Sequence, residues 1–123
     1  MWRALIPLLL LAAAPAETLT IGGVAFPQSD FVDARGIFDE TGMPVIYVTL
    51  SPTGTAKLAK VTRANVGNEM PLMIGSRVLT KPIVREPLLS GSFQISGMAN
   101  LDEARMLAKA ISGRDPLPES LDE

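Results

Sequence analysis

Hydrophobic and polar residues alternate along the chain in short blocks, and most of these blocks predict β-strands. The clearest strand covers residues 45–50, a run of six residues of which four are β-branched. Residues 18–26 predict a strand with a bend or bulge at Gly22 and Gly23. Shorter strands are expected at residues 35–38 and 92–96, and residues 70–80 predict a hairpin that turns at Gly75 and Ser76.

Two blocks show helical rather than alternating spacing. In the first, Ser51 is a good N-cap, Pro52 occupies the first helical position and Gly67 provides the stop. In the second, Asn100 is the N-cap and Gly113 the stop, and the residue three after the cap is a glutamate, as in a capping box. The inward-facing stripes are predicted to be Leu58, Val61, Thr62 and either Asn65 or Val66 in the first helix, and Leu101, Ala104, Leu107 or Ala108, and Ile111 in the second.

These elements predict an α+β fold: a four- to five-stranded antiparallel or mixed sheet with two helices packed on one face. Val45, Tyr47 and Met73 would then lie on the opposite face of the sheet. That face is either an exposed apolar contact surface or is covered by residues 18–26, and the pattern favours neither alternative.

The two ends of the chain differ from its middle. Residues 4–14 form an apolar run of eleven residues after Arg3, and small residues follow it, as in a secretory signal peptide cleaved after Ala16. An uncleaved anchor is the alternative, although the run is about half the ~20 residues that a spanning helix needs. We therefore expect a signal peptide at residues 1–16, a periplasmic domain at 17–113 and a disordered acidic tail at 114–123.

Composition restricts the chemistry. The chain has 11 basic and 13 acidic residues, a net charge of −2, which argues against a nucleic-acid partner. It has no histidine and no cysteine, so the commonest general base, nucleophile and metal ligands are missing. We expect no catalytic, cofactor or metal site. An enzyme would need two carboxylates brought together in a cleft, such as Asp33, Asp39 or Glu86.

Two sets of residues are candidates for binding. Lys57, Lys60 and Arg63 fall on one side of the first helix, where they form either a docking stripe for an acidic partner or an ordinary solvated face. Met70, Met73 and Phe93 could line an apolar groove, because methionine and aromatic side chains suit adaptable binding.

Several motifs occur in one order from residue 62 to residue 104. They comprise Thr62, Asn65, Val66 and Gly67; residues 81–87 (KPIVREP); residues 91–97 (GSFQISG); and residues 102–104 (DEA). In order and spacing they resemble the head of the first periplasmic domain of SecD, a subunit of the bacterial protein-export machinery. Lys81, Phe93 and Ala99 depart from the pattern of that family.

The resemblance implies a non-enzymatic periplasmic module that contacts unfolded or extended polypeptide, with the export machinery as a possible partner. The contact residues would be Val45, Tyr47, Met70, Met73 and Phe93. The alternative is a structural or partner-docking protein, either a monomer or a homo-oligomer, that kept the fold without a role in export. A membrane would be reached only through an uncleaved signal sequence.

Overall fold

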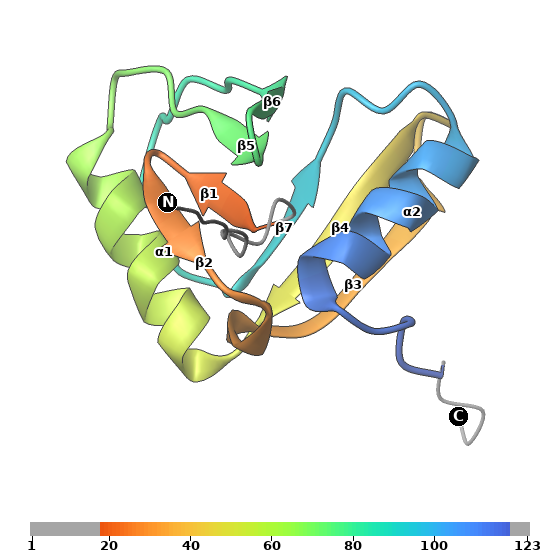
Figure 1. Cartoon of the computed structure of the whole chain (residues 1–123). Coiled ribbons are helices and arrows are strands. Elements are labelled where there is room, and N and C mark those ends of the chain that lie inside the picture. The colour runs from red at the N-terminus through yellow and green to blue at the C-terminus, as the bar shows by residue number, and fades with distance from the viewer. Residues whose placement is uncertain (1–17, 119–123) are drawn as a thin grey trace, which may run out of the picture.

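The computed structural model describes residues 18–118 and shows an α+β fold with two antiparallel sheets and two helices (Figure 1). The predicted fold class is therefore confirmed, although two sheets replace the single sheet that we expected. The four-stranded sheet has the order β2-β1-β5-β6, and the three-stranded sheet has the order β3-β4-β7. The elements are β1 (Leu19–Ile21), β2 (Val24–Phe26), β3 (Phe31–Phe38), β4 (Pro44–Leu50), α1 (Pro52–Ala64), β5 (Leu72–Ile74), β6 (Arg77–Thr80), β7 (Ser92–Ile95) and α2 (Leu101–Ser112).

The first two strands form a hairpin where the sequence suggested one interrupted strand. Gly22 and Gly23 both have positive φ angles, 58° and 83°, so the chain reverses between them instead of bulging. Ile21 pairs with Val24 across this turn, and β1 then pairs on its other side with β5. The β1–β2 hairpin explains why a second sheet forms. β1 pairs with β5 of the predicted β5–β6 hairpin, so the two hairpins together make a four-stranded sheet.

The three-stranded sheet carries the longest strands. β3 begins at Phe31 and pairs with β4 as far as the Phe38–Pro44 pair, so it is longer than the strand expected at residues 35–38. A 3-10 turn, Gln28–Asp30, leads directly into it. β7 pairs with the other side of β4, from Ile46 opposite Ile95 to Thr49 opposite Ser92.

The two helices cover different parts of the structure. α2 packs on β3 and β4, whereas α1 lies beside the β1–β2 hairpin (Figure 1). Gly36 permits close packing of α2, because a Cβ atom at this position would lie 2.5 Å from the backbone nitrogen of Arg105. Gly36 pairs with Ile46, so these two residues face α2, and Val45 and Tyr47 face the opposite side of the sheet.

The predicted helix caps are present. The Ser51 hydroxyl accepts a hydrogen bond from the Gly54 amide (3.1 Å), and the Asn100 side chain accepts one from the Glu103 amide (2.8 Å). The Glu103 carboxylate reaches back to the amide of Ala99 (2.7 Å), one residue before the cap. α1 ends at Ala64, three residues before the expected stop at Gly67.

A single hydrophobic core joins both sheets and both helices. Its buried side chains include Leu19, Ile21, Phe26, Ile46, Val48, Leu58, Ile95, Ala104 and Ile111. Within residues 18–118, none of the helices is long and apolar enough to cross a membrane. The signal peptide that we predict at residues 1–16 lies outside the described residues.

Candidate functional site

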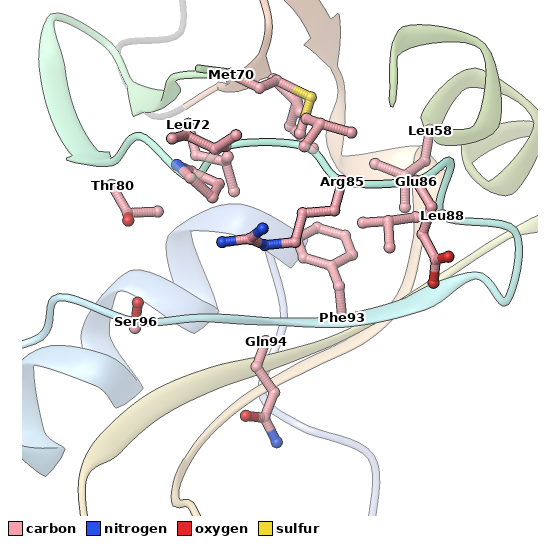
Figure 2. A pocket seen from close by; sticks show the side chains of 14 residues that line it. Leu58, Met70, Leu72, Thr80, Arg85, Glu86, Leu88, Phe93, Gln94 and Ser96 are labelled. Atoms are coloured by element: carbon pink, nitrogen blue, oxygen red, sulfur yellow. The ribbon is translucent and has the colours of Figure 1, made fainter. Parts of the chain in front are cut away.

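A cavity of about 310 Å³ opens between β7 and the chain segment of residues 82–88 (Figure 2). Its floor consists of buried apolar side chains from four separate elements or connections. Ile21 comes from β1, Leu58 from α1, Met70 from the connection before β5, and Leu72 from β5. The hairpin at the start of the chain and the helix that follows β4 therefore both contribute to this floor.

One wall of the cavity is β7. The Phe93 side chain points into the cavity and packs against the hydrophobic core, while the Gln94 side chain points away from the cavity (Figure 2). Gln94 nevertheless borders the cavity, as does Ser96 just beyond the strand. Because successive side chains of a strand point to opposite faces, β7 contributes the Phe93 ring and part of its backbone to this wall.

The segment of residues 82–88 forms the other wall and is fixed by hydrogen bonds at both ends. The Met70 amide donates to the Pro82 carbonyl (2.8 Å), and the Val84 amide donates to the Asn68 carbonyl (3.0 Å). Further along, the Leu88 amide donates to the hydroxyl of Thr62 (2.9 Å), which is fully buried in α1.

Thr62 was predicted only as part of the buried stripe, and its contact with the cavity wall was missed. The signal that could have found it is a polar residue at a buried helix position, because a buried hydroxyl needs hydrogen-bond partners. Thr62 donates to the carbonyl of Leu58 (2.7 Å) within its own helix and accepts from Leu88. Its side chain therefore ties the cavity wall to α1.

The mouth of the cavity combines apolar and charged side chains. Ile83 lines it with 57% of its surface exposed, and Leu88 lines it with 37% exposed. Arg85 extends over the cavity towards Phe93, and Glu86 follows it in the same wall (Figure 2). The arrangement offers apolar contact deep inside and both signs of charge at the entrance.

The structure brings together two of the five predicted contact residues. Met70 and Phe93 line the cavity. Met73 is half-buried on β5 and does not line the cavity, because its neighbour Leu72 faces it instead. Val45 is only 2% exposed, and Tyr47 is half-buried on the face of the three-stranded sheet that α2 leaves uncovered.

The predicted basic stripe on α1 is divided. Lys60 and Arg63 are exposed, but Lys57 is engaged with the β2 region of its own chain. Its ammonium group lies 2.6 Å from a carboxylate oxygen of the buried Asp30 and 2.6 Å from the Ala25 carbonyl. It also lies 4.6 Å from the centre of the Phe26 ring, within the range of a cation–π contact.

Two of the three acidic residues considered for an enzyme site, Asp33 and Asp39, have structural partners of their own. Burial acts to raise the pKa of Asp33, but hydrogen bonds from Arg35 and from the Leu117 amide outweigh it, and the pKa is lowered. Hydrogen bonds from the Met43 amide and the Thr41 side chain lower the pKa of Asp39. Within residues 18–118, no three acidic side chains gather in a way that could hold a metal ion.

Comparison with known proteins gives consistent matches. The model of the SecDF P1 head subdomain matches residues 14–114. The SecDF protein translocase subunit of Thermus thermophilus is 34% identical over 99 residues, which cover 80% of this chain and 14% of that protein. The SecD subunit of Dictyoglomus turgidum is 32% identical over 98 residues, covering 79% of this chain and 25% of that one.

Solved structures agree with these sequence matches. A structure of the membrane component SecDF, described as enhancing protein export, superposes with a TM-score of 0.66 at 30% identity, over 75% of this chain and 44% of that one. SecDF in its super-membrane-facing form gives the same TM-score and identity, over 13% of its chain. The chain spans a quarter or less of the length of the curated relatives named above. From its sequence and its fold, this chain belongs to the SecDF P1 head subdomain family.

Proposed function

We propose that this protein is an accessory module of protein export that binds extended polypeptide in the cavity between β7 and residues 82–88. Its place would be the periplasm, as the predicted signal peptide suggests. Membership of the SecDF P1 head family supports the link to export. The proposal involves no catalysis, since the binding of an unfolded chain needs only a surface.

The dimensions and lining of the cavity favour a polypeptide side chain as the bound group. About 310 Å³ lies at the small end of the ~300–1,000 Å³ usual for ligand pockets, which suits a few side chains and excludes a folded domain. Met70 and Phe93 offer adaptable apolar contact, which fits ligands that vary in sequence.

The observation that carries the proposal is the continuity of the apolar surface from the mouth of the cavity to its floor. Ile83 is largely exposed, and Phe93 and the buried Met70 line the same cavity. A single exposed aliphatic side chain would need no explanation, but one that adjoins an apolar cavity extends a contiguous apolar surface, and such a surface often marks a contact site.

A binding measurement tests this proposal with a matched pair of variants. A fluorescent, unstructured peptide with leucine at alternating positions is titrated with the protein, and anisotropy reports binding. Ile83→Glu places a charge at the mouth of the cavity and should weaken binding about tenfold or more. Val78→Glu is the control, because Val78 is 47% exposed on β6 and does not line the cavity.

Equal binding by the two variants, or no binding by the unmodified protein, would contradict the proposal. Ile83 is exposed, so Ile83→Glu should fold normally. A thermal unfolding curve that matches that of Val78→Glu would show that lost affinity is not lost structure.

A further inference from the structure

The edge of β7 that faces away from β4 carries free backbone groups. The Leu50 amide donates to the Gly91 carbonyl (2.8 Å), which fixes the phase of the hydrogen bonds between β4 and the strand that follows Gly91. In an antiparallel pair the backbone groups of successive residues point alternately towards and away from the partner strand. The backbone N–H and C=O groups of Phe93 and Ile95 therefore form hydrogen bonds with β4, whereas those of Ser92 and Gln94 point away from it.

Ser92 and Gln94 differ in how these outward groups are satisfied. The hydroxyl of Ser90 donates to the Ser92 carbonyl (3.1 Å) and accepts from the Ser92 amide (3.3 Å), as a neighbouring strand would. The corresponding groups of Gln94 have no partner within residues 18–118, and Gln94 borders the cavity. The free edge thus begins where the contact with Ser90 ends.

The opposite wall of the cavity, residues 82–88, also carries unpaired backbone groups. The amides of Met70 and Val84 bond across to the Pro82 and Asn68 carbonyls, on either side of the pair formed by Glu69 and Ile83. This pattern directs the N–H and C=O groups of Ile83 away from Glu69. Within the described part of the chain they have no partner, and Ile83 lines the cavity.

We propose that a polypeptide in this cavity binds as an added β-strand, paired through its backbone with Gln94 at the edge of β7. This inference rests on the proposed function and specifies how the ligand is held. Alternate side chains of the added strand would lie on the same face as Phe93 and enter the apolar cavity. The ligand class is therefore an extended segment with apolar residues at every second position.

This mode of binding explains how one cavity can accept many sequences. Backbone hydrogen bonds are the same for every residue except proline, so they provide affinity without a sequence requirement. Arg85 and Glu86 contribute one charge of each sign to the lining of the cavity, which gives little preference for the charge of the ligand.

An N-methyl scan of the peptide separates backbone pairing from side-chain binding. The probe is the fluorescent peptide with leucine at alternating positions, now with threonine at the positions between them, synthesised in versions that each carry one N-methylated amide. Methylation removes one donor and leaves every side chain in place. We expect affinity to fall about tenfold when the methyl group is on alternating amides, those that face β7, and to change less at the amides between them, which face the other way.

Two protein variants provide an independent test. Gln94→Pro removes the outward amide that we assign to the ligand and should reduce affinity about tenfold, whereas Gln94→Ala should bind as the unmodified protein does, because the Gln94 side chain points away from the cavity (Figure 2). Circular dichroism of Gln94→Pro checks that the protein remains folded. If this variant does not fold, the N-methyl scan of the peptide alone tests whether the ligand pairs through its backbone.

The outcomes distinguish the two proposals. If the unmethylated peptide binds with an affinity that Ile83→Glu reduces, but methylation has no alternating effect, the added strand is excluded and the proposed function stands. If the unmethylated peptide does not bind at all, the proposed function fails and this inference fails with it.

Discussion

At the scale of single residues, Lys57 shows how a charged side chain on a helix surface can serve its own fold. The sequence placed it with Lys60 and Arg63 on one side of α1, and the alternatives were a docking stripe and a solvated face. Its contacts with the Asp30 carboxylate and the Ala25 carbonyl instead connect α1 to the region around β2. Helical spacing predicts which residues share a side, but it carries no information on what lies opposite that side.

We predict that Lys57→Ala lowers the free energy of unfolding by about 2 kcal/mol, because it leaves the carboxylate of Asp30, which is only 5% exposed, without its cation. Lys60→Ala, one turn along on the exposed surface, should leave stability unchanged within the error of a urea titration. The double variant Lys57→Ala with Asp30→Asn should recover part of the loss. Equal stability of Lys57→Ala and Lys60→Ala would show that the contact between Lys57 and Asp30 contributes nothing to the free energy of unfolding.

At the scale of elements, signals for helix ends and turns in the sequence were informative. Ser51 and Asn100 cap their helices as expected, and Gly75 turns the predicted hairpin with a φ angle of 58°. The same reasoning could not tell a bulge from a turn at Gly22 and Gly23, because glycine permits both. Pairing of β1 with β5, far along the chain, is what the local sequence could not reveal.

Packing of α2 on β3 leads to a prediction at this scale. Gly36→Ala should destabilise the protein by about 2 kcal/mol, since the added methyl group would lie 2.5 Å and 2.7 Å from backbone atoms of Arg105 and Ala104, which cannot move without moving the helix. Alanine is otherwise better than glycine within a strand, so the collision must exceed that gain.

Gly42→Ala is the matched control for Gly36→Ala. Its φ angle of 86° disfavours alanine by about 1 kcal/mol, but a Cβ atom there would meet nothing within 4 Å. Thermal or urea unfolding of both variants gives the comparison. A smaller loss for Gly36→Ala than for Gly42→Ala would mean that α2 is less closely packed than the structure shows.

At the scale of the whole molecule, the chain after α2 returns to β3. We expected residues 114–123 to be disordered, and the structure describes the first five of them, residues 114–118. The Arg114 guanidinium donates to the Phe31 carbonyl (2.6 Å), and the Leu117 amide donates to the Asp33 carboxylate (2.8 Å). The charged and proline residues of this segment suggested disorder. The local sequence could not reveal its partners, because they lie more than eighty positions earlier in the chain.

We predict that this contact weakens in acid. The pKa of Asp33 is lowered below its ordinary value of 3.8, so the charged form is favoured in the folded state and its stabilising effect is complete above that value. The effect is lost as the pH falls through the still lower pKa of the folded protein. The chemical shift of the Leu117 amide proton, followed by NMR, should therefore titrate with a midpoint below pH 3.8.

Variants at neutral pH separate this contact from a general effect of acid. Asp33→Asn should speed hydrogen exchange at the Leu117 amide, because it removes the charge that the amide contacts. Asp115→Asn should not, since the ion pair of Asp115 with Lys109 is highly exposed at both ends. A Leu117 titration midpoint above 3.8, or equal exchange in both variants, would contradict the assignment.

The candidate site was only partly predictable. Met70 and Phe93 were identified because their chemistry suits binding, and both line the cavity. Val45 and Tyr47 lie on the face of their sheet away from α2, whereas Met73, which we expected on the same face, lies in the other sheet. The sequence also could not show that Val45 is buried. The cavity depends on the distance between β7 and residues 82–88, which is set by tertiary contacts such as the one between Thr62 and Leu88.

Strand pairing between distant parts of the chain has a consequence for the order in which the protein can fold. Leu19 pairs with Ile74, and Ile46 pairs with Ile95, so each sheet needs strands from both halves of the chain. A growing chain cannot complete either sheet until most of its residues have been synthesised. Closing such long loops costs entropy before the contacts form. The chain should therefore fold more slowly, and stay unfolded for longer, than a helical protein of its size.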